Sequence, residues 1–194
     1  FNKILVHISV NTVAAYQVAG RLDMLVFLPI FSIAASLTTL VGMFYGAKEY
    51  GALRYIIKYG IFSALLITII SSIIVYTFAG NVVRFFTDDA SIVIIAVNFL
   101  QIFAFAYPFI AVGITTGRVL QGLGKGLPVL IITIVRVLGV SAPLALFFVF
   151  IMDKTVEWVW YSMILSTIVA FGIGLTWLVS TLKTLPASRQ SLNN

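Results

Sequence analysis

The chain has 194 residues, of which 61% are hydrophobic and only 9% are charged. A soluble domain carries about a quarter charged residues, so this composition excludes an ordinary soluble protein and indicates a membrane protein. The net charge of +6 does not indicate nucleic-acid binding, because the basic residues are spread between apolar stretches and form no patch. The sequence contains no cysteine, which excludes disulfides and thiolate metal sites.

Apolar stretches long enough to cross a bilayer follow one another along the chain. A helix needs about 20 apolar residues to span the hydrocarbon core, and only helices and closed barrels pair all their backbone groups there. Four of the stretches contain an uncharged run of this length, and a fifth contains only Arg136. We therefore expect transmembrane helices at about residues 13–46, 55–80, 90–118, 127–152 and 157–182.

The first residues form a less regular segment. Residues 4–20 are short for a span and contain Asn11 and Gln17, so we expect the tail of a truncated helix, a connection and the first turns of the next helix. The chain begins with Phe1, not Met, and we expect it to be a piece of a longer protein. The expected fold is all-α: a polytopic transmembrane helical bundle over residues 1–183, with five full spans plus the tail of a sixth, then a polar tail over residues 184–194.

The charged residues lie mostly in the hinges between these spans, and their sign alternates along the chain. Cytoplasmic loops of membrane proteins carry an excess of Lys and Arg. One set of hinges has seven basic residues and one acid, whereas the opposite set has two basic residues and four acids. We therefore expect the hinges with Lys48 and Lys125, and the C-terminal tail after Lys183, to be cytoplasmic.

Three prolines, Pro29, Pro108 and Pro143, lie inside apolar stretches. Proline removes a backbone donor and clashes with the carbonyl four residues earlier, so each helix is expected to bend there. Bent helices serve as hinges around the central site of many transporters, but proline is also frequent in transmembrane helices in general. The three prolines are therefore hinge candidates, with a purely structural role as the alternative.

Polar side chains on the third span are candidates for a substrate path. Asn98, Gln101, Phe105 and Pro108 follow one another at spacings of three and four, and so share one face of a straight helix, with Tyr107 beside them. Amides in the hydrocarbon zone must face a partner or water. These two amides therefore line a cavity or bond to a neighbouring helix.

Arg136, Asp23 and Gln17 complete the candidates for the substrate path or for ion coupling. A guanidinium at the bilayer centre costs roughly 2.5–3.5 kcal/mol, so Arg136 needs a partner facing the interior of the bundle. Asp23 is the only acid near a membrane segment. Either Arg21 neutralises it at the interface, or Asp23 is a proton or cation site.

The sequence shows no constellation typical of an enzyme. His7 is the only histidine, so no histidine-based triad or multi-histidine metal site is available. No embedded acids pair at helical spacing, and no P-loop is present. The glycine-rich run at residues 122–126 indicates a tight turn between two spans.

Several local motifs follow one another in a distinctive order. VAAYQVAGRL at residues 13–22 is followed by Leu-Pro at residues 28–29 and by LVGMFYGAK at residues 40–48. FFTDD at residues 85–89 and LQGLGKGLP at residues 120–128 come next, and then Arg136 with Pro143. From about Val13 to Leu182, this order and spacing resemble the C-terminal half of the multidrug and toxic compound extrusion (MATE) family of efflux transporters.

The resemblance implies half of a twelve-helix, two-bundle transporter that exports cationic or amphipathic drugs in exchange for protons or sodium by alternating access. The implied partners are the lipid bilayer, small organic cations and the N-terminal bundle of the full-length protein, with no cofactor and no nucleic acid. Some subfamilies carry coupling acids in the seventh and tenth helices, but the third span here has no acid. The resemblance therefore implies that coupling resides mainly in the N-terminal bundle.

Two alternatives to a drug antiporter stay open at this point. A lipid-linked oligosaccharide flippase of the same wider superfamily shares the bundle plan, although flippase cavities tend to be strongly cationic and Arg136 is the one embedded arginine here. A structural membrane protein that transports nothing is the second alternative, and bent helices and an embedded arginine make it less attractive.

Overall fold

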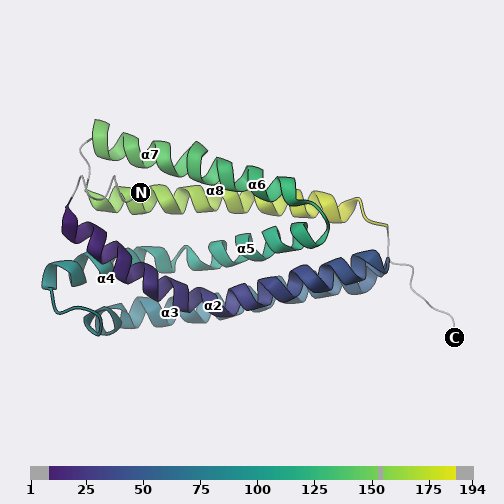
Figure 1. The fold of residues 1–194 in the computed structure, drawn as a ribbon, viewed down its shortest axis with the longest axis horizontal. Helices are drawn as coiled ribbons and strands as arrows, with labels where there is room; N and C mark the ends of the chain where they lie inside the picture. The colour runs from purple at the N-terminus through teal and green to yellow at the C-terminus, as the bar shows by residue number, and fades with distance from the viewer. Residues whose placement is uncertain (1–8, 153–154, 187–194) are drawn as a thin grey trace.

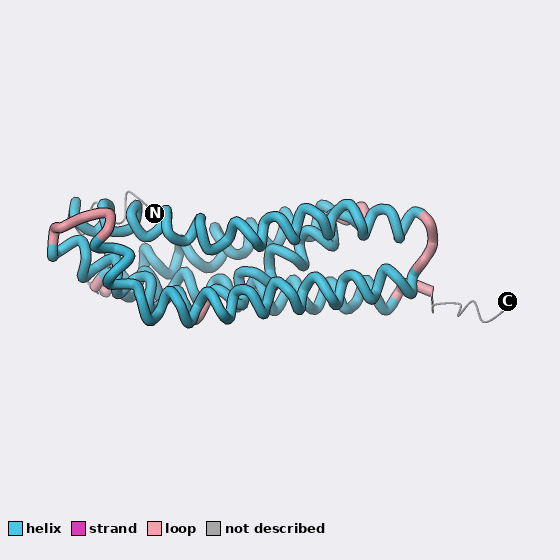
Figure 2. The backbone as a smooth tube through the Cα atoms, turned by 90° about the horizontal axis from the view of Figure 1, so that it is seen from below, coloured by secondary structure: helices cyan, strands magenta, loops and turns pink. Residues whose placement is uncertain are grey.

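The computed structural model describes residues 9–152 and 155–186, and within them every regular element is a helix. Figure 1 shows long helices lying side by side along one axis, and Figure 2 shows turns at the two ends of the molecule. The helices are α2 (Val10–Gly46), α3 (Tyr50–Arg84), α4 (Ala90–Ala104), α5 (Tyr107–Gly122), α6 (Gly126–Ile134), η1 (Val135–Ser141), α7 (Ala142–Leu146), η2 (Phe147–Ile151) and α8 (Val156–Lys183).

Within residues 9–152 and 155–186, four helical stretches are long and apolar enough to cross a membrane, and a fifth is added when α4 and α5 are counted as one bent span. The all-helical membrane fold predicted from the sequence is confirmed. The expected tail of a preceding helix falls largely on residues 1–8, which lie outside the described residues, as does the C-terminal tail beyond Pro186. The helix α2 begins at Val10, so the segment around Gln17 is part of this regular helix.

The turns at one end of the bundle are tied together by side chains of the helix starts. Asp89 is the N-cap of α4, where the Ser91 hydroxyl and then the backbone N–H groups of Ser91 and Ile92 donate to its carboxylate. These bonds favour the charged form and lower the pKa of Asp89. The amide of Asn11 on α2 donates to the Ser91 hydroxyl and so joins the starts of α2 and α4.

The third span is interrupted at the position where the sequence predicts a bend. The helix α4 ends at Ala104, α5 begins at Tyr107, and the two axes meet at 59°. Pro108 occupies the first turn of α5, where a missing N–H costs nothing. The interruption leaves the carbonyl of Ala104 without a helical partner, and the Ser72 hydroxyl of α3 donates to it at 2.8 Å.

The other two prolines act differently on their helices. The helix α2 continues as an α-helix through Pro29. Pro143 lies in the first turn of α7, directly after the π-helical η1, and a second π-helical segment, η2, follows α7. The fourth span is thus distorted over several turns around Pro143, without a break.

The helices α2 and α5 approach closely where α5 ends. A Cβ built on Gly122 would lie 2.7 Å from the carbonyl oxygen of Thr38 and 2.9 Å from Cβ of Val41. Such distances are shorter than van der Waals contact, so only glycine permits this approach. A small residue at the end of α5 therefore fixes the distance between the two helices, as expected of membrane helix interfaces.

The end of α8 is held by a side chain from α3. The Arg54 guanidinium donates to the carbonyl oxygens of Leu182, Leu185 and Pro186 at 3.3, 3.1 and 3.3 Å. These carbonyls lie in the last turn of α8 or just after it, where the helix offers no partner. Lys125, from the turn after α5, donates to Thr181 of α8 at 3.3 Å, so three basic segments converge at this end of the bundle.

Substituting alanine for Gly122 tests the packing of α2 on α5. We expect Gly122→Ala to lower the free energy of unfolding by about 1–3 kcal/mol, because the methyl group forces the two backbones apart. Gly113→Ala, on the same helix, is the control: its added Cβ meets no atom within 4 Å, so stability is unchanged or rises by about 0.5–1 kcal/mol. The measurement is unfolding of the purified protein in detergent, and equal effects of the two variants contradict the packing.

Removing the Arg54 guanidinium tests the capping of α8. We expect Arg54→Gln to lower the free energy of local opening of the last turn of α8 by about 1 kcal/mol. Hydrogen exchange of the Thr184 amide then becomes about fivefold faster. That amide bonds to the carbonyls of Ser180 and Thr181. Lys58→Gln, an exposed basic residue on the same helix, leaves the exchange rate unchanged. An equal increase of the exchange rate in both variants would show that net charge, and not capping by Arg54, stabilises the end of α8.

Candidate functional site

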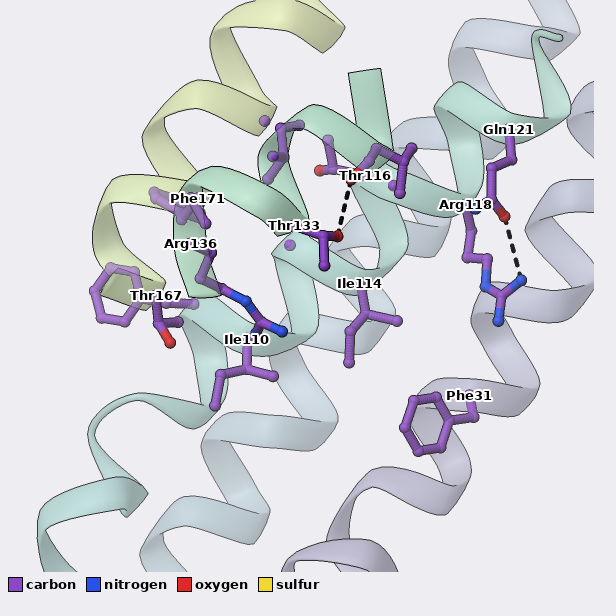
Figure 3. Close-up of a pocket in the computed structure, with 17 residues that line it drawn as sticks. Phe31, Ile110, Ile114, Thr116, Arg118, Gln121, Thr133, Arg136, Thr167 and Phe171 are labelled. Atoms are coloured by element: carbon purple, nitrogen blue, oxygen red, sulfur yellow. Dashed lines mark hydrogen bonds between the residues drawn. The ribbon is translucent and has the colours of Figure 1, made fainter. Parts of the chain in front are cut away.

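A cleft of about 460 Å³ with several polar side chains in its lining lies between α5, α6, η1 and α8. Figure 3 shows this cleft, with Phe31 of α2 at one side and the Arg136 guanidinium extending into it. Its polar lining comes from Thr116, Arg118, Gln121, Thr133, Arg136 and Thr167. The rest of the wall is largely apolar and includes three aromatic side chains, Phe31, Phe109 and Phe171.

The helical geometry of the fourth span places Arg136 in this cleft. Arg136 is the second residue of η1, and a π-helical turn carries one more residue per hydrogen-bonded ring than an α-helical turn. Pro143 cannot donate to the carbonyl of Gly139 and so helps to sustain this irregular stretch. Segments of this kind occur often at functional sites because they turn one side chain out of its regular position.

Two guanidinium groups give the cleft a positive potential. Arg118 donates to Gln121 at 3.2 Å, one turn further along α5. Within the described part of the chain, the Arg136 side chain makes no hydrogen bond or ion pair. The inward-facing partner expected from the sequence is therefore not found among these residues, and the cleft itself offers Arg136 a polar, open surrounding. Positive charge beside aromatic faces suits an amphipathic ligand.

A second cavity of about 450 Å³ lies at the bend between α4 and α5. Phe105 and Pro108 line it together with Tyr76 of α3. The ring centroids of Tyr76 and Phe105 are 5.7 Å apart. Asn98 and Gln101 line neither of these two cavities. The expectation that all four residues share one face is therefore corrected, because it assumes a straight helix and the chain bends by 59° between them.

The two amides of α4 have no hydrogen bond with other described residues, and the Oδ1 atom of Asn98 is buried. A buried amide oxygen without a partner is costly, so Asn98 is the most conspicuous polar group on this helix. Gln101 is half-buried, while Gln17 is exposed on α2. The structure therefore does not bring these three amides together into one site.

Asp23 and Tyr107 form a pair that the sequence does not suggest. The Tyr107 hydroxyl donates to Oδ1 of Asp23, joining α2 to the first residue of α5. Tyr107 is fully buried, and the ring of Phe27 packs edge-on against it at 5.3 Å. Arg21 is exposed, and no ion pair joins it to Asp23 within the described residues. The two partners are 84 positions apart in the chain, and no local motif marks such a contact.

Metal binding by side chains has no support in the described part of the structure. No three His, Cys, Asp or Glu residues gather there closely enough to hold an ion. The sites that remain are the positively charged cleft and the Asp23–Tyr107 pair.

Cysteine labelling tests whether the cleft holds water. An unpaired guanidinium needs hydration, so we expect Thr133→Cys, in the cleft lining, to react with a charged methanethiosulfonate at least about tenfold faster than Leu138→Cys. Leu138 is 66% exposed on the same span but does not line the cleft. This chain has no cysteine of its own, so it adds no background labelling. Equal rates at the two positions would contradict a hydrated cleft.

Comparisons with known proteins give one consistent result. The MatE family model matches residues 1–147. A probable multidrug resistance protein NorM from Thermotoga maritima is 27% identical over 180 residues, which cover 93% of this chain and 39% of that protein. The chain thus spans about two fifths of the length of this relative.

Solved structures agree with the sequence match. A MOP superfamily transporter from Pyrococcus furiosus, described as having a binding pocket of reverse polarity, superposes with a TM-score of 0.87 at 26% identity, covering 95% of this chain and 42% of that one. A MATE protein crystallised in a bent conformation superposes with a TM-score of 0.86 at 27% identity. The match covers 95% of this chain and 41% of that one. These matches belong to transporters, and not to enzymes. The chain is part of a multi-pass membrane protein and belongs to the MATE family of multidrug efflux transporters.

Proposed function

We propose that the full-length protein exports cationic or amphipathic compounds in exchange for protons or sodium by alternating access. The observation that carries this proposal is the superposition of 95% of the chain on 41% of a MATE transporter. Such coverage fits one bundle of a two-bundle protein, and alternating access requires one bundle to rock against the other. This chain then supplies the C-terminal bundle, which is the transmembrane unit over residues 1–183, and the N-terminal bundle is its partner.

The proposed orientation places the basic end of the bundle in the cytoplasm. Arg54 and Lys125 lie at the end where α8 finishes, and Lys48 and Lys183 are in the hinge and the last turn at this end. An excess of Lys and Arg is typical of cytoplasmic loops. The C-terminus is therefore proposed to be cytoplasmic, in a multi-pass protein of the cell membrane.

The substrate path is proposed to run along the cleft and past the bent span. Aromatic faces in the cleft bind an organic cation without a buried countercharge. Asn98, Gln101 and Gln17 are proposed to contribute neutral polar contacts, while Pro29, Pro108 and Pro143 are the proposed hinge positions. No cofactor is needed, because ion exchange supplies the energy, and most of the coupling is proposed to reside in the N-terminal bundle.

A second candidate function follows from the charge of the cleft. Arg118 and Arg136 both line it, and two guanidiniums favour a ligand that carries a phosphate or carboxylate. The Pyrococcus furiosus relative, with its reverse-polarity pocket, is described as suggesting a different function. A transporter of anionic amphiphiles, such as a lipid-linked oligosaccharide flippase, is therefore the alternative. A structural protein that transports nothing is disfavoured by the family.

Efflux from energised cells separates the two candidates. In a host without its own efflux pumps, we expect the full-length protein to export ethidium, and a protonophore or removal of sodium to stop the export, which identifies the coupling ion. Under the leading proposal, Arg136→Ala leaves ethidium efflux within about twofold or increases it, because a positive charge near the path repels a cation.

Under the alternative, ethidium is not exported, and transport of an anionic amphiphile falls about tenfold in Arg136→Ala, the effect of losing one charge-assisted contact of about 1.4 kcal/mol. Arg84→Ala, at the exposed end of α3, is the matched control in both assays. Membrane levels of all variants are compared first. A well-expressed protein that exports neither compound contradicts both candidates.

A further inference from the structure

Asp23 is the one acidic residue placed within the interior of a described span. Among the other acids, Glu49 precedes α3, Asp88 and Asp89 precede α4, and Glu157 lies in the first turn of α8. Asp23 instead lies more than three turns inside α2, with twenty-three further helical residues after it. A carboxylate at such a position is costly in a membrane and is a functional-site candidate by default.

Among the residues that the structure describes, no cation lies close enough to Asp23 to neutralise it. Tyr107 is its one hydrogen-bond partner among the described residues, and Tyr16 is the other titratable group close to it, on its own helix. The helix α4 has no titratable side chain, and within its apolar part α3 has only tyrosines, Tyr59 and Tyr76, which are exposed. The charged groups of α3 are Arg54 and Lys58, within its first nine residues, and Arg84, its last residue.

The remaining charge on α5 is already engaged elsewhere. Arg118 lies three turns beyond Tyr107 and donates to Gln121. Arg21, two residues before Asp23, is exposed. The charge on Asp23 is thus stabilised by one hydroxyl group inside an aromatic enclosure that includes Phe27.

The position of Tyr107 connects this carboxylate to the bend. Tyr107 is the first residue of α5, and the two residues before it form the break from α4. The end of α4 is tied to α3 by the bond from Ser72 to the Ala104 carbonyl. The start of α5 is tied to α2 by the bond from Tyr107 to Asp23. Of these two hydrogen bonds, only the one between Tyr107 and Asp23 includes a carboxylate, which is a group that can take up a proton.

We propose that Asp23 is a proton-binding site of this bundle and that Tyr107 transmits its occupancy to the bend between α4 and α5. The inference rests on the proposed function and deepens it, because it adds a proton site in the C-terminal bundle to those proposed for the N-terminal one. A proton suits the site better than sodium. One carboxylate and one hydroxyl give far fewer oxygen ligands than a bound metal cation takes, and no acid cluster lies nearby among the described residues.

The proton step changes one bond. When Asp23 is ionised, the Tyr107 hydroxyl donates to a carboxylate in a charge-assisted bond, which is roughly twice as strong as a neutral one. When a proton binds the carboxylate, Tyr107 keeps its own proton and the contact becomes a weaker bond between two neutral groups. The start of α5 is then held less firmly to α2, while Ser72 still holds the end of α4. Release of the proton restores the original bond.

A distance measured across the bend tests this inference in the full-length protein, freed of any cysteines. Spin labels at Ile94→Cys on α4 and Gln121→Cys on α5, both exposed positions, report the angle between the helices. We expect their distance distribution to change between about pH 5 and about pH 8, a range wide enough to titrate a carboxyl in an apolar setting. Asp23→Asn is expected to lose this change completely, because the amide has almost the same shape but takes up no proton.

Two further variants complete the design. Tyr107→Phe keeps the ring and removes the hydroxyl, so we expect it to lose most of the pH-dependent change. Asp88→Asn makes the same substitution at an exposed acid in the hinge before α4, and we expect it to keep the full change. The inference is overturned by a distance that does not respond to pH in the unsubstituted labelled protein, by a full response in Asp23→Asn or in Tyr107→Phe, or by a response that follows sodium at constant pH.

Ethidium efflux, measured in vesicles on the unlabelled protein with Gln121 intact, separates this inference from the proposed function. A protein that shows the pH-dependent distance but exports neither ethidium nor an anionic amphiphile rejects the proposed transport and keeps the proton site. A protein that exports ethidium while the distance stays constant keeps the proposed function and rejects the proton site.

Discussion

Every backbone N–H and C=O group inside a bilayer must find a partner within the protein, because water is absent there and an unpaired group costs several kcal/mol. At the bend between α4 and α5, Ser72 supplies a hydroxyl for the Ala104 carbonyl that the break exposes. At the basic end of the bundle, the guanidinium of Arg54 likewise donates to carbonyls that the end of α8 exposes. The places where helices stop or bend are therefore decided by which neighbouring side chain can reach the exposed carbonyls.

The sequence predicts the spans well, because stretches without charge are a direct physical requirement of the hydrocarbon core. It predicts the helix ends less well: the second span is expected at 55–80, but α3 extends over Tyr50–Arg84, because the helix continues through charged residues such as Arg54 and Arg84. The bend at Pro108 is predictable, but its form is not: the third span is interrupted there, whereas α2 remains one α-helix through Pro29. A proline bends a helix sharply only where its neighbours satisfy the groups that the bend exposes.

The candidate sites were harder to predict, for a geometric reason. Arg21 is the nearest cation to Asp23 in sequence, but residues two apart on a helix point in different directions and do not face each other. The partner found in the structure, Tyr107, is 84 positions away and depends on how α5 crosses α2. That crossing is set in part by Gly122, at the far end of the same helix, which carries no signal of a polar contact. Arg136 could be recognised as embedded, but not which helices form its cleft.

Polar groups left without partners are distributed unevenly in this bundle. Asn98 Oδ1, the Thr116 hydroxyl and Trp160 Nε1 are buried and unpaired within the described residues, and Arg136 faces an open cleft. In a protein with a single resting structure, buried polar groups such as these are normally hydrogen-bonded. A bundle that rocks against a partner through two states cannot pair all of them in both, so some bonds must be exchangeable. The bond between Tyr107 and Asp23 is of this kind: its strength depends on a proton, and it holds the first residue of α5, directly after the break from α4.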